Sequence, residues 1–347
     1  MQELPRHRRM LLLTEGRLGV FSSKTAAAIL RFRGHDVAGI IDSTTAKRDV
    51  REFVPFAPRV PIFASVADAA ACRPDSLYIG VAPVGGALPE TMRRHVVDAL
   101  MSGLHVVSGL HNFLGDDEQL AAPAKASGAV IHDVRRPPTE QIVASKLAAQ
   151  CRCRRVLTVG TDCNVGKMFA ALRLRDAVRE RGIDGRFAAT GQTGIMIEGW
   201  GTAIDAVVSD FAAGAAEQLV TRCADSQLCI VEGQGSLSHP GFSAVTLALL
   251  HGVCPHALVL VHHLGRATFS APPRHALPNI GALIAAYEAT AALVHPTRVV
   301  GIAVNSHGVD AAAAREERAA LEQQFALPTC DLAVDDPGPM VEAIMQR

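Results

Sequence analysis

Long apolar runs and an excess of charge of either sign are both missing from this sequence of 347 residues. No stretch reaches the roughly 18 consecutive apolar residues that a membrane-spanning helix needs, so we expect no membrane partner. Lys and Arg together number 34, and so do Asp and Glu, which argues against a surface that binds nucleic acid or anionic lipid. The basic start MQELPRHRRM leads only into LLL and TEG, which predicts a first strand and not a signal peptide.

Closely spaced cysteines are also scarce. The eight cysteines are scattered, and Cys151 and Cys153 form the one close pair, without a second Cys or His pair at zinc spacing. A chain of this length can build its cores without disulfides. We therefore expect reduced thiols, a cytoplasmic protein and no metal centre. Aromatic residues make up only 4% of the chain, and the abundant Ala and Gly suit tightly packed α/β layers.

Short apolar runs that alternate with helical patterns are what the sequence has in abundance. This alternation is typical of parallel strands joined by crossover helices. We expect strands at 10–13, 36–42, 76–83, 104–110, 128–134, 154–160, 186–191, 227–233, 257–263 and 298–305. In the second half we expect helices at about 139–150, 166–181, 204–223, 242–252, 279–293 and 310–324. The predicted fold class is α/β, with an N-terminal Rossmann-like parallel-sheet domain (1–140) and a C-terminal P-loop NTPase-like α/β domain (141–347).

The first domain lacks the G-x-G-x-x-G fingerprint of dinucleotide-binding domains. Gly16 and Gly19 mark its first strand-to-helix turn, and Asp42 ends the second strand, where an acid can meet a ribose. Because the glycine spacing departs from the fingerprint, a bound dinucleotide is the lesser alternative to glycines that only turn the chain.

The strongest motif lies between an expected strand and an expected helix, in the stretch VGTDCNVGKMF. Successive backbone N–H groups in such a loop form a nest for phosphate oxygens, the helix dipole adds to it, and the lysine supplies a mobile charge. Met168 stands where nucleotide hydrolases place the Ser or Thr that binds magnesium. The predicted phosphate-binding residues are Gly160, Thr161, Asp162, Cys163, Asn164, Val165, Gly166, Lys167 and Met168.

Two further glycine-bearing loops, at 190–194 and 231–235, follow strands of the second domain, so we expect them to face the phosphate loop. Together the three loops resemble those of dethiobiotin synthetase and its P-loop relatives, which carry G-T-D-x-x-V-G-K-T, Q-T-G and V-E-G-A-G-G. The resemblance implies that the cofactor site also includes Gln192, Thr193, Gly194 and Asn305, the last at a base-recognising position. Two departures are Met168 and the lysine before Q-T-G, which falls near Ala189.

A closer resemblance covers nearly the whole chain. It is carried, in one order, by the motifs SSKTA, GVAPVGGALP, VSGLHNFL, GTDCNVGKM, ATGQTGIMI, VEGQGSLSHP and VTLALLHG. They resemble the two-domain bacterial family DUF1611, long described as a domain of unknown function, which includes a D-glutamate N-acetyltransferase. The resemblance implies an acetyl-CoA-dependent N-acetyltransferase acting on an acidic D-amino acid, D-glutamate first. We also expect the protein to form a homo-oligomer. Its expected binding partner is the small-molecule amino-acid substrate.

The missing magnesium hydroxyl agrees with coenzyme A as the ligand, because acyl transfer never breaks its phosphates whereas phosphoryl transfer relies on a metal. Two alternatives stay open. One is a ligase- or kinase-like enzyme that uses ATP with Mg²⁺, and the other is a nucleotide sensor without catalysis.

Acetyl transfer to an amine needs a base that takes up the proton of the amine. Glu232, at a strand end, is the first candidate, and its alternative role is to orient the phosphate loop. His239 is the second candidate and Asp210 the third. Cys163 could form an acyl-cysteine as a minor alternative. Cations for an acidic substrate could come from Lys24, Arg266 and Arg274.

Overall fold

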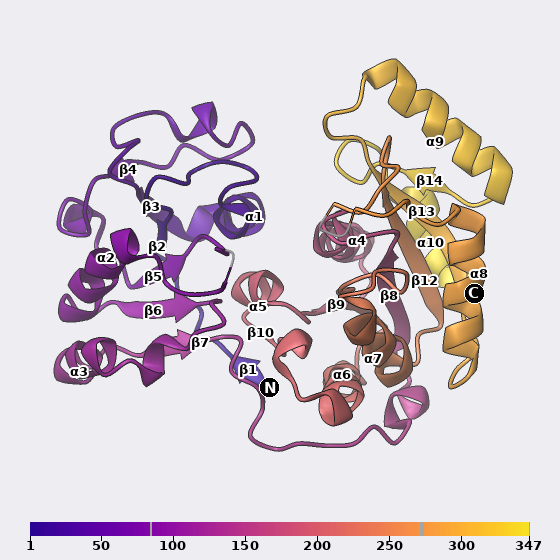
Figure 1. Cartoon of the computed structure of the whole chain (residues 1–347), viewed down its shortest axis with the longest axis horizontal. Helices are drawn as coiled ribbons and strands as arrows, with labels where there is room; N and C mark the ends of the chain where they lie inside the picture. Colours follow the sequence, from indigo (N-terminus) through magenta and orange to yellow (C-terminus); the bar gives the residue numbers. More distant parts are fainter. Residues whose placement is uncertain (84, 271–273, 347) are drawn as a thin grey trace. The chain divides into compact units, whose positions relative to one another are not determined.

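The computed structural model describes residues 1–83, 85–270 and 274–346, and the chain forms two compact units (Figure 1). The N-terminal unit comprises Gln2–Pro137 and Ile195–Ala206. The C-terminal unit comprises Pro138–Gly194 and the chain from Val207 onward. The sequence-based division at residues 140 and 141 had placed 195–206 in the second domain. Val84, within the motif GVAPVGGALP, lies outside the described residues.

The N-terminal unit is built on a parallel sheet, six-stranded in its described part, with the order β4-β3-β2-β5-β6-β7. Its strands are β2 (Met10–Leu13), β3 (Val37–Ile41), β4 (Ile62–Phe63), β5 (Ser76–Ile79), β6 (His105–Ser108) and β7 (Ile131–Asp133). Its helices include α1 (Lys24–Arg33), α2 (Glu90–Met101) and α3 (Glu118–Ser127). Strands are added outward from β2 in both directions, as in the Rossmann fold, so the predicted fold of this domain is confirmed.

The C-terminal unit holds a second parallel sheet, of order β14-β13-β12-β8-β11-β9 among the described residues. Its strands are β8 (Arg154–Gly160), β9 (Gly185–Ala188), β11 (Leu228–Val231), β12 (Ala257–His263), β13 (Arg298–Asn305) and β14 (Thr329–Cys330). Its helices include α4 (Lys167–Glu180), α6 (Ser209–Arg222), α7 (Ser243–Val253), α8 (Ile280–Ala292), α9 (Ala311–Phe325) and α10 (Gly338–Gln346). Because all strands are parallel, the ends of β8, β11, β12 and β13 meet at one edge. No helix of the described chain has the length and apolarity needed to cross a membrane.

The prediction of a helix at 139–150 is wrong. Only Leu147–Gln150 forms a 3-10 turn there, and the residues before it run without a helix along α6. We call residues 139–146 the strap. The strap can lie against α6 because residue 214 is a glycine, since a Cβ on Gly214 would lie 1.7 Å from the carbonyl O of Ile142. The buried carboxylate of Glu217 then accepts the backbone N–H of Ser145 at 2.9 Å. A side-chain acceptor on α6 thus replaces the hydrogen bonds that a helix would have made.

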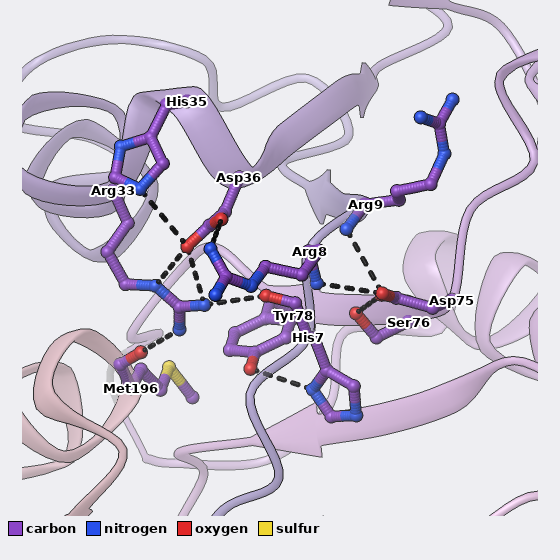
Figure 2. Close-up of polar contacts among 10 residues, drawn as sticks. All are labelled: His7, Arg8, Arg9, Arg33, His35, Asp36, Asp75, Ser76, Tyr78 and Met196. Atoms are coloured by element: carbon purple, nitrogen blue, oxygen red, sulfur yellow. Dashed lines mark hydrogen bonds and ion pairs between the residues drawn. The ribbon is translucent and has the colours of Figure 1, made fainter.

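Arg33 explains why residues 195–206 belong to the N-terminal unit (Figure 2). Its guanidinium donates to the carbonyl O of Met196 at 2.9 Å and to the carbonyl O of His7 at 2.7 Å. It also donates twice to the Asp36 carboxylate, at 2.9 and 3.0 Å. A second link is the antiparallel pairing of β1 (Gln2–Glu3) with β10 (Trp200–Gly201). One buried cation therefore joins three segments that are distant in sequence.

His7 lies beside this cluster and is 5% exposed. Its Nδ1 shares a hydrogen bond of 2.9 Å with the Tyr78 hydroxyl (Figure 2), and its ring lies 5.5 Å from that of His105 and 6.0 Å from that of His132. Burial lowers the pKa of His7 to about 4. The charge of Asp75 opposes this shift, and the charges of His105, His132 and Arg33 add to it. The folded protein therefore holds His7 neutral where an unfolded chain would protonate it.

Replacing His7 with phenylalanine should reduce the destabilisation of the protein by acid. The unfolded state takes up a proton near pH 6.5, whereas the folded state does so only near pH 4, so the free energy of unfolding falls as the pH drops through this window. Between pH 7 and pH 4.5, urea unfolding should show a loss about 2 kcal/mol larger in the wild type than in His7→Phe. His111→Phe, at an exposed histidine of the same unit, serves as the control. Equal losses in all three proteins would contradict the prediction.

Candidate functional site

The loop between β8 and α4 has the backbone of a phosphate cradle. Asn164 and Gly166 both adopt positive φ, 55° and 110°, which turns the chain sharply before α4 begins at Lys167. Gly160 leaves room inside the turn, because a Cβ there would lie 2.9 Å from the Lys167 Nζ. The predicted strand–loop–helix arrangement is therefore present. Met168 follows as a half-buried residue in the first turn of α4.

Lys167 lies inside the loop and is only 7% exposed. Its Nζ donates to the carbonyl O of Asp162 at 2.8 Å. Burial lowers the pKa of Lys167 to about 8, although the charges of Cys163, Asp162 and Glu232 oppose the shift. At neutral pH the lysine is therefore still mostly cationic, and its one hydrogen bond to a carbonyl can be exchanged for a phosphate oxygen.

Asp162 ties the loop to the segment that follows β12. Its fully buried carboxylate accepts the Arg266 guanidinium at 3.0 Å and the backbone N–H of Ser270 at 2.7 Å. Arg266 also donates to the carbonyl O of Cys163 at 3.0 Å. Arg266, expected from the sequence only as a contact for an acidic substrate, therefore lies at the phosphate loop. No spacing rule would have indicated this contact across about a hundred residues of sequence.

Three further residues fix the loop from neighbouring elements. The Thr161 hydroxyl hydrogen-bonds His262 Nδ1 at 3.0 Å, and the Asn305 amide donates to the carbonyl O of Val165 at 3.2 Å. The Tyr287 hydroxyl of α8 donates to the carbonyl O of Gly160 at 2.8 Å. Sequence reasoning missed Tyr287, because nothing in the helical pattern of α8 distinguishes it from an ordinary core residue.

Glu232 holds the turn that follows β9. Its Oε2 accepts the backbone N–H groups of Thr190 at 2.9 Å and Gly191 at 3.1 Å. Gly194 allows this approach, because a Cβ there would lie 2.4 Å from Oε2. Residues 192–194, expected as a loop, instead form the start of α5 (Gln192–Glu198). The Glu232 carboxylate thus binds the N–H groups that lie just before this helix. The structure therefore gives Glu232 a positioning contact, and its role as a base stays a prediction.

Gly233 brings the same strand end against the phosphate loop. Its backbone N–H donates to the Thr158 hydroxyl at 2.9 Å. A Cβ on Gly233 would lie 1.6 Å from the carbonyl O of Thr158 and 3.1 Å from the Lys167 side chain. Only glycine fits between β8 and the lysine at this point.

His239 is 1% exposed and packs against two aromatic rings, with its ring centroid 4.6 Å from that of Phe242 and 4.9 Å from that of Phe269. Its Nδ1 accepts the backbone N–H of Gly241 at 3.1 Å. A ring nitrogen of His239, the Cys163 sulfur and an Asp162 carboxylate oxygen all lie within 4.8 Å of one another. The second candidate base thus lies directly at the phosphate loop.

The third candidate base, Asp210, is exposed in the first turn of α6. No hydrogen bond of the described chain links it to the phosphate loop. Its neighbour Asp205 forms an ion pair with Arg135 in the N-terminal unit.

In the Rossmann-like sheet, the Asp42 carboxylate is fully buried and accepts the hydroxyls of Thr14 and Thr44, so these local hydrogen bonds already occupy it.

Known proteins match both units. Residues 43–137 match the Rossmann-like N-terminal domain of DUF1611, and residues 142–341 match its P-loop domain, both described as domains of unknown function. A D-glutamate N-acetyltransferase from a Pseudoalteromonas species is 39% identical over 268 residues, covering 77% of this chain and 80% of the relative. Another, from Tritonibacter scottomollicae, is 38% identical over 278 residues, covering 80% and 83%. The crystal structure of a DUF1611 family protein from Anabaena variabilis is 39% identical, with a TM-score of 0.92 over 98% of this chain and 100% of that one.

Proposed function

Because this chain belongs to the DUF1611 family, with D-glutamate N-acetyltransferases among its relatives, we propose that it transfers an acetyl group from acetyl-CoA to an acidic D-amino acid. D-Glutamate is the substrate that the names of the relatives favour. The identity of 39% and 38% to these two proteins, over most of each chain, is the observation that carries the proposal.

The phosphate loop supports coenzyme A as the acetyl donor. It offers backbone N–H groups and the cations of Lys167 and Arg266, but Met168 removes the usual magnesium hydroxyl. Phosphoryl transfer relies on a metal to neutralise phosphate oxygens, whereas acyl transfer leaves the phosphates of coenzyme A intact. A loop that holds phosphates without a metal suits the second task.

In the proposed reaction, the neutral amine attacks the thioester carbonyl and forms the amide C–N bond. The C–S bond breaks and coenzyme A leaves as a thiolate, and the proton that the amine nitrogen loses passes through the base to this thiolate. With its phosphates in the loop, the pantetheine arm carries the thioester away from the loop. Glu232 and His239 then serve the phosphate end of the ligand. Asp210 is exposed in α6, and no hydrogen bond of the described residues connects it with the loop, so a role as the base for the amine stays a prediction for it as for Glu232.

Calorimetry and a turnover assay test the proposal together. Acetyl-CoA should bind with the same affinity with and without Mg²⁺, and free thiol should be released with D-glutamate and much less with L-glutamate. Magnesium-dependent ATP hydrolysis that Lys167→Ala abolishes would favour the ligase-like alternative. Binding without turnover of any amine would favour a sensor.

Replacing Glu232 with glutamine is expected to weaken acetyl-CoA binding by about tenfold or more, with a smaller change in kcat. The carboxylate accepts two backbone N–H groups, and hydrogen bonds to a charged group contribute about 1.5–3 kcal/mol. Steady-state kinetics should therefore show a raised KM for acetyl-CoA. Glu316→Gln, at an exposed position of α9, should leave both constants unchanged. If kcat instead fell by about 10²–10⁴ at constant KM, Glu232 would be the general base.

A further inference from the structure

His239 carries a buried hydrogen-bond donor that has no acceptor in the described part of the chain. Because its Nδ1 accepts the N–H of Gly241, that nitrogen has no proton, and the proton of the neutral ring is on Nε2. Nε2 is fully buried and has no hydrogen-bond partner among the described residues. Burying a polar group without a partner is costly, so a ligand atom that accepts this N–H would stabilise the complex.

A metal ion does not fit this site well, although Asp162, Cys163 and His239 could supply ligand atoms within 4.8 Å of one another. A histidine that binds a metal through Nε2 must carry its proton on Nδ1 and donate it to an acceptor. Here Nδ1 faces the N–H of Gly241, which is itself a donor. The Asp162 carboxylate is already shared by Arg266 and two backbone N–H groups.

Two cations lie at the turn of the loop beside His239, and the Asp162 carboxylate pairs with one of them, Arg266. Lys167 and Arg266 both contact the same turn of the loop, the first at the carbonyl O of Asp162 and the second at the carbonyl O of Cys163. The helix dipole of α4 adds a positive potential at this end of the helix. The aromatic rings of Phe242 and Phe269 both pack against the imidazole and restrict its movement.

We propose that the Nε2–H of His239 donates a hydrogen bond to a phosphate oxygen of the ligand in the loop, and that His239, Lys167 and Arg266 together form a metal-free phosphate site. The ligand class is a pyrophosphate or phosphate ester that binds without a chelated cation. This inference relies on the proposed function only for the identity of the ligand as coenzyme A. His239 is then a binding residue and not a general base.

Calorimetry with inorganic pyrophosphate and with coenzyme A, both in EDTA, tests the proposal. His239→Phe keeps an aromatic ring against Phe242 and Phe269 but lacks the donor, and it should weaken both ligands about tenfold. His239→Gln retains an N–H near the position of Nε2 and should bind within about threefold of the wild type. His263→Phe, at a neighbouring residue that hydrogen-bonds its own turn, should bind like the wild type. Equal binding by His239→Phe and the wild type would overturn the proposal.

Two further measurements keep the test decisive. If His239→Phe does not fold, nitrogen NMR of the wild type with labelled histidine should show the Nε2–H of one histidine shifting when pyrophosphate is added, and no shift would overturn the proposal. Stoichiometric Zn²⁺ binding that His239→Gln abolishes would also overturn it, in favour of a metal site. Pyrophosphate binding that depends on His239, without acetyl transfer, would leave this inference standing and reject the proposed function. Acetyl transfer by a protein whose pyrophosphate binding does not depend on His239 would reject this inference and leave the proposed function standing.

Discussion

Replacing Lys167 with alanine should weaken acetyl-CoA binding at least tenfold, in the presence or absence of Mg²⁺. The Nζ of Lys167 is buried in the loop, and its hydrogen-bond partner among the described residues is the carbonyl O of Asp162. Losing a charge-assisted contact to phosphate typically costs about 1.5–3 kcal/mol, which corresponds to roughly 10- to 150-fold in the dissociation constant. Calorimetry on the purified variant measures the effect directly. Unchanged affinity would remove the loop from the cofactor site.

The pH dependence of binding gives an internal control for this prediction. The pKa of Lys167 is lowered to about 8, so the lysine is cationic below that pH and loses its charge above it. A bound phosphate favours the cationic form, so the affinity of the wild type should fall as the pH rises from 8 to 9.5. Lys167→Ala should lack this fall. A wild-type affinity that stays constant over the range would indicate that another group supplies the charge.

Replacing Gly233 with alanine should prevent stable folding of the C-terminal unit. The added Cβ would lie 1.6 Å from the carbonyl O of Thr158 and 2.7 Å from its carbonyl carbon. Both are backbone atoms of the central strand β8, which is hydrogen-bonded on both sides and cannot easily move away. Steric conflicts of this kind belong to the substitutions that cost more than about 4 kcal/mol. We expect little soluble protein, or a melting temperature lowered by about 10 °C or more.

Gly241→Ala is the matched control for this experiment. A Cβ on Gly241 would lie 3.7 Å from the His239 ring, which is an ordinary van der Waals distance. Its melting temperature should therefore be close to that of the wild type. If Gly233→Ala also melted like the wild type, β8 and the end of β11 would have to be farther apart than the structure places them.

The sequence predicted the long buried strands best. The expected ranges 154–160, 257–263 and 298–305 coincide with β8, β12 and β13, because these strands are continuous apolar runs that both faces of a parallel sheet bury. The two-residue strands β1, β4, β10 and β14 were missed, because so short a segment has no periodicity. The family resemblance drawn from the motifs is confirmed by the matches to both domains.

Contacts between distant segments could not be predicted in the same way. The strap at 139–146 has a helix-compatible sequence, but its conformation is decided by Gly214 and Glu217 on α6. The Q-T-G segment is rich in loop-forming residues, yet it is helical where the carboxylate of Glu232 accepts the preceding N–H groups. The position of His239 depends on the fold of two loops, the loop after β11 that carries His239 and the loop after β12 that carries Phe269, and both return to the end of β8. None of these contacts leaves a spacing signal in the sequence.

The three-way contact of Arg33 also has a consequence for the order of events during synthesis. The N-terminal unit needs the carbonyl O of Met196 to complete the hydrogen bonds of Arg33, and it needs β10 to pair with β1. The ribosome must therefore add the strap, the phosphate loop and α4 before the first unit can close. At about 5–20 residues per second, this delays closure by several seconds after Pro137 has been added. During that interval a nascent chain holds all six strands of the Rossmann-like sheet, while the buried Arg33 still lacks one acceptor and β1 still lacks its partner strand.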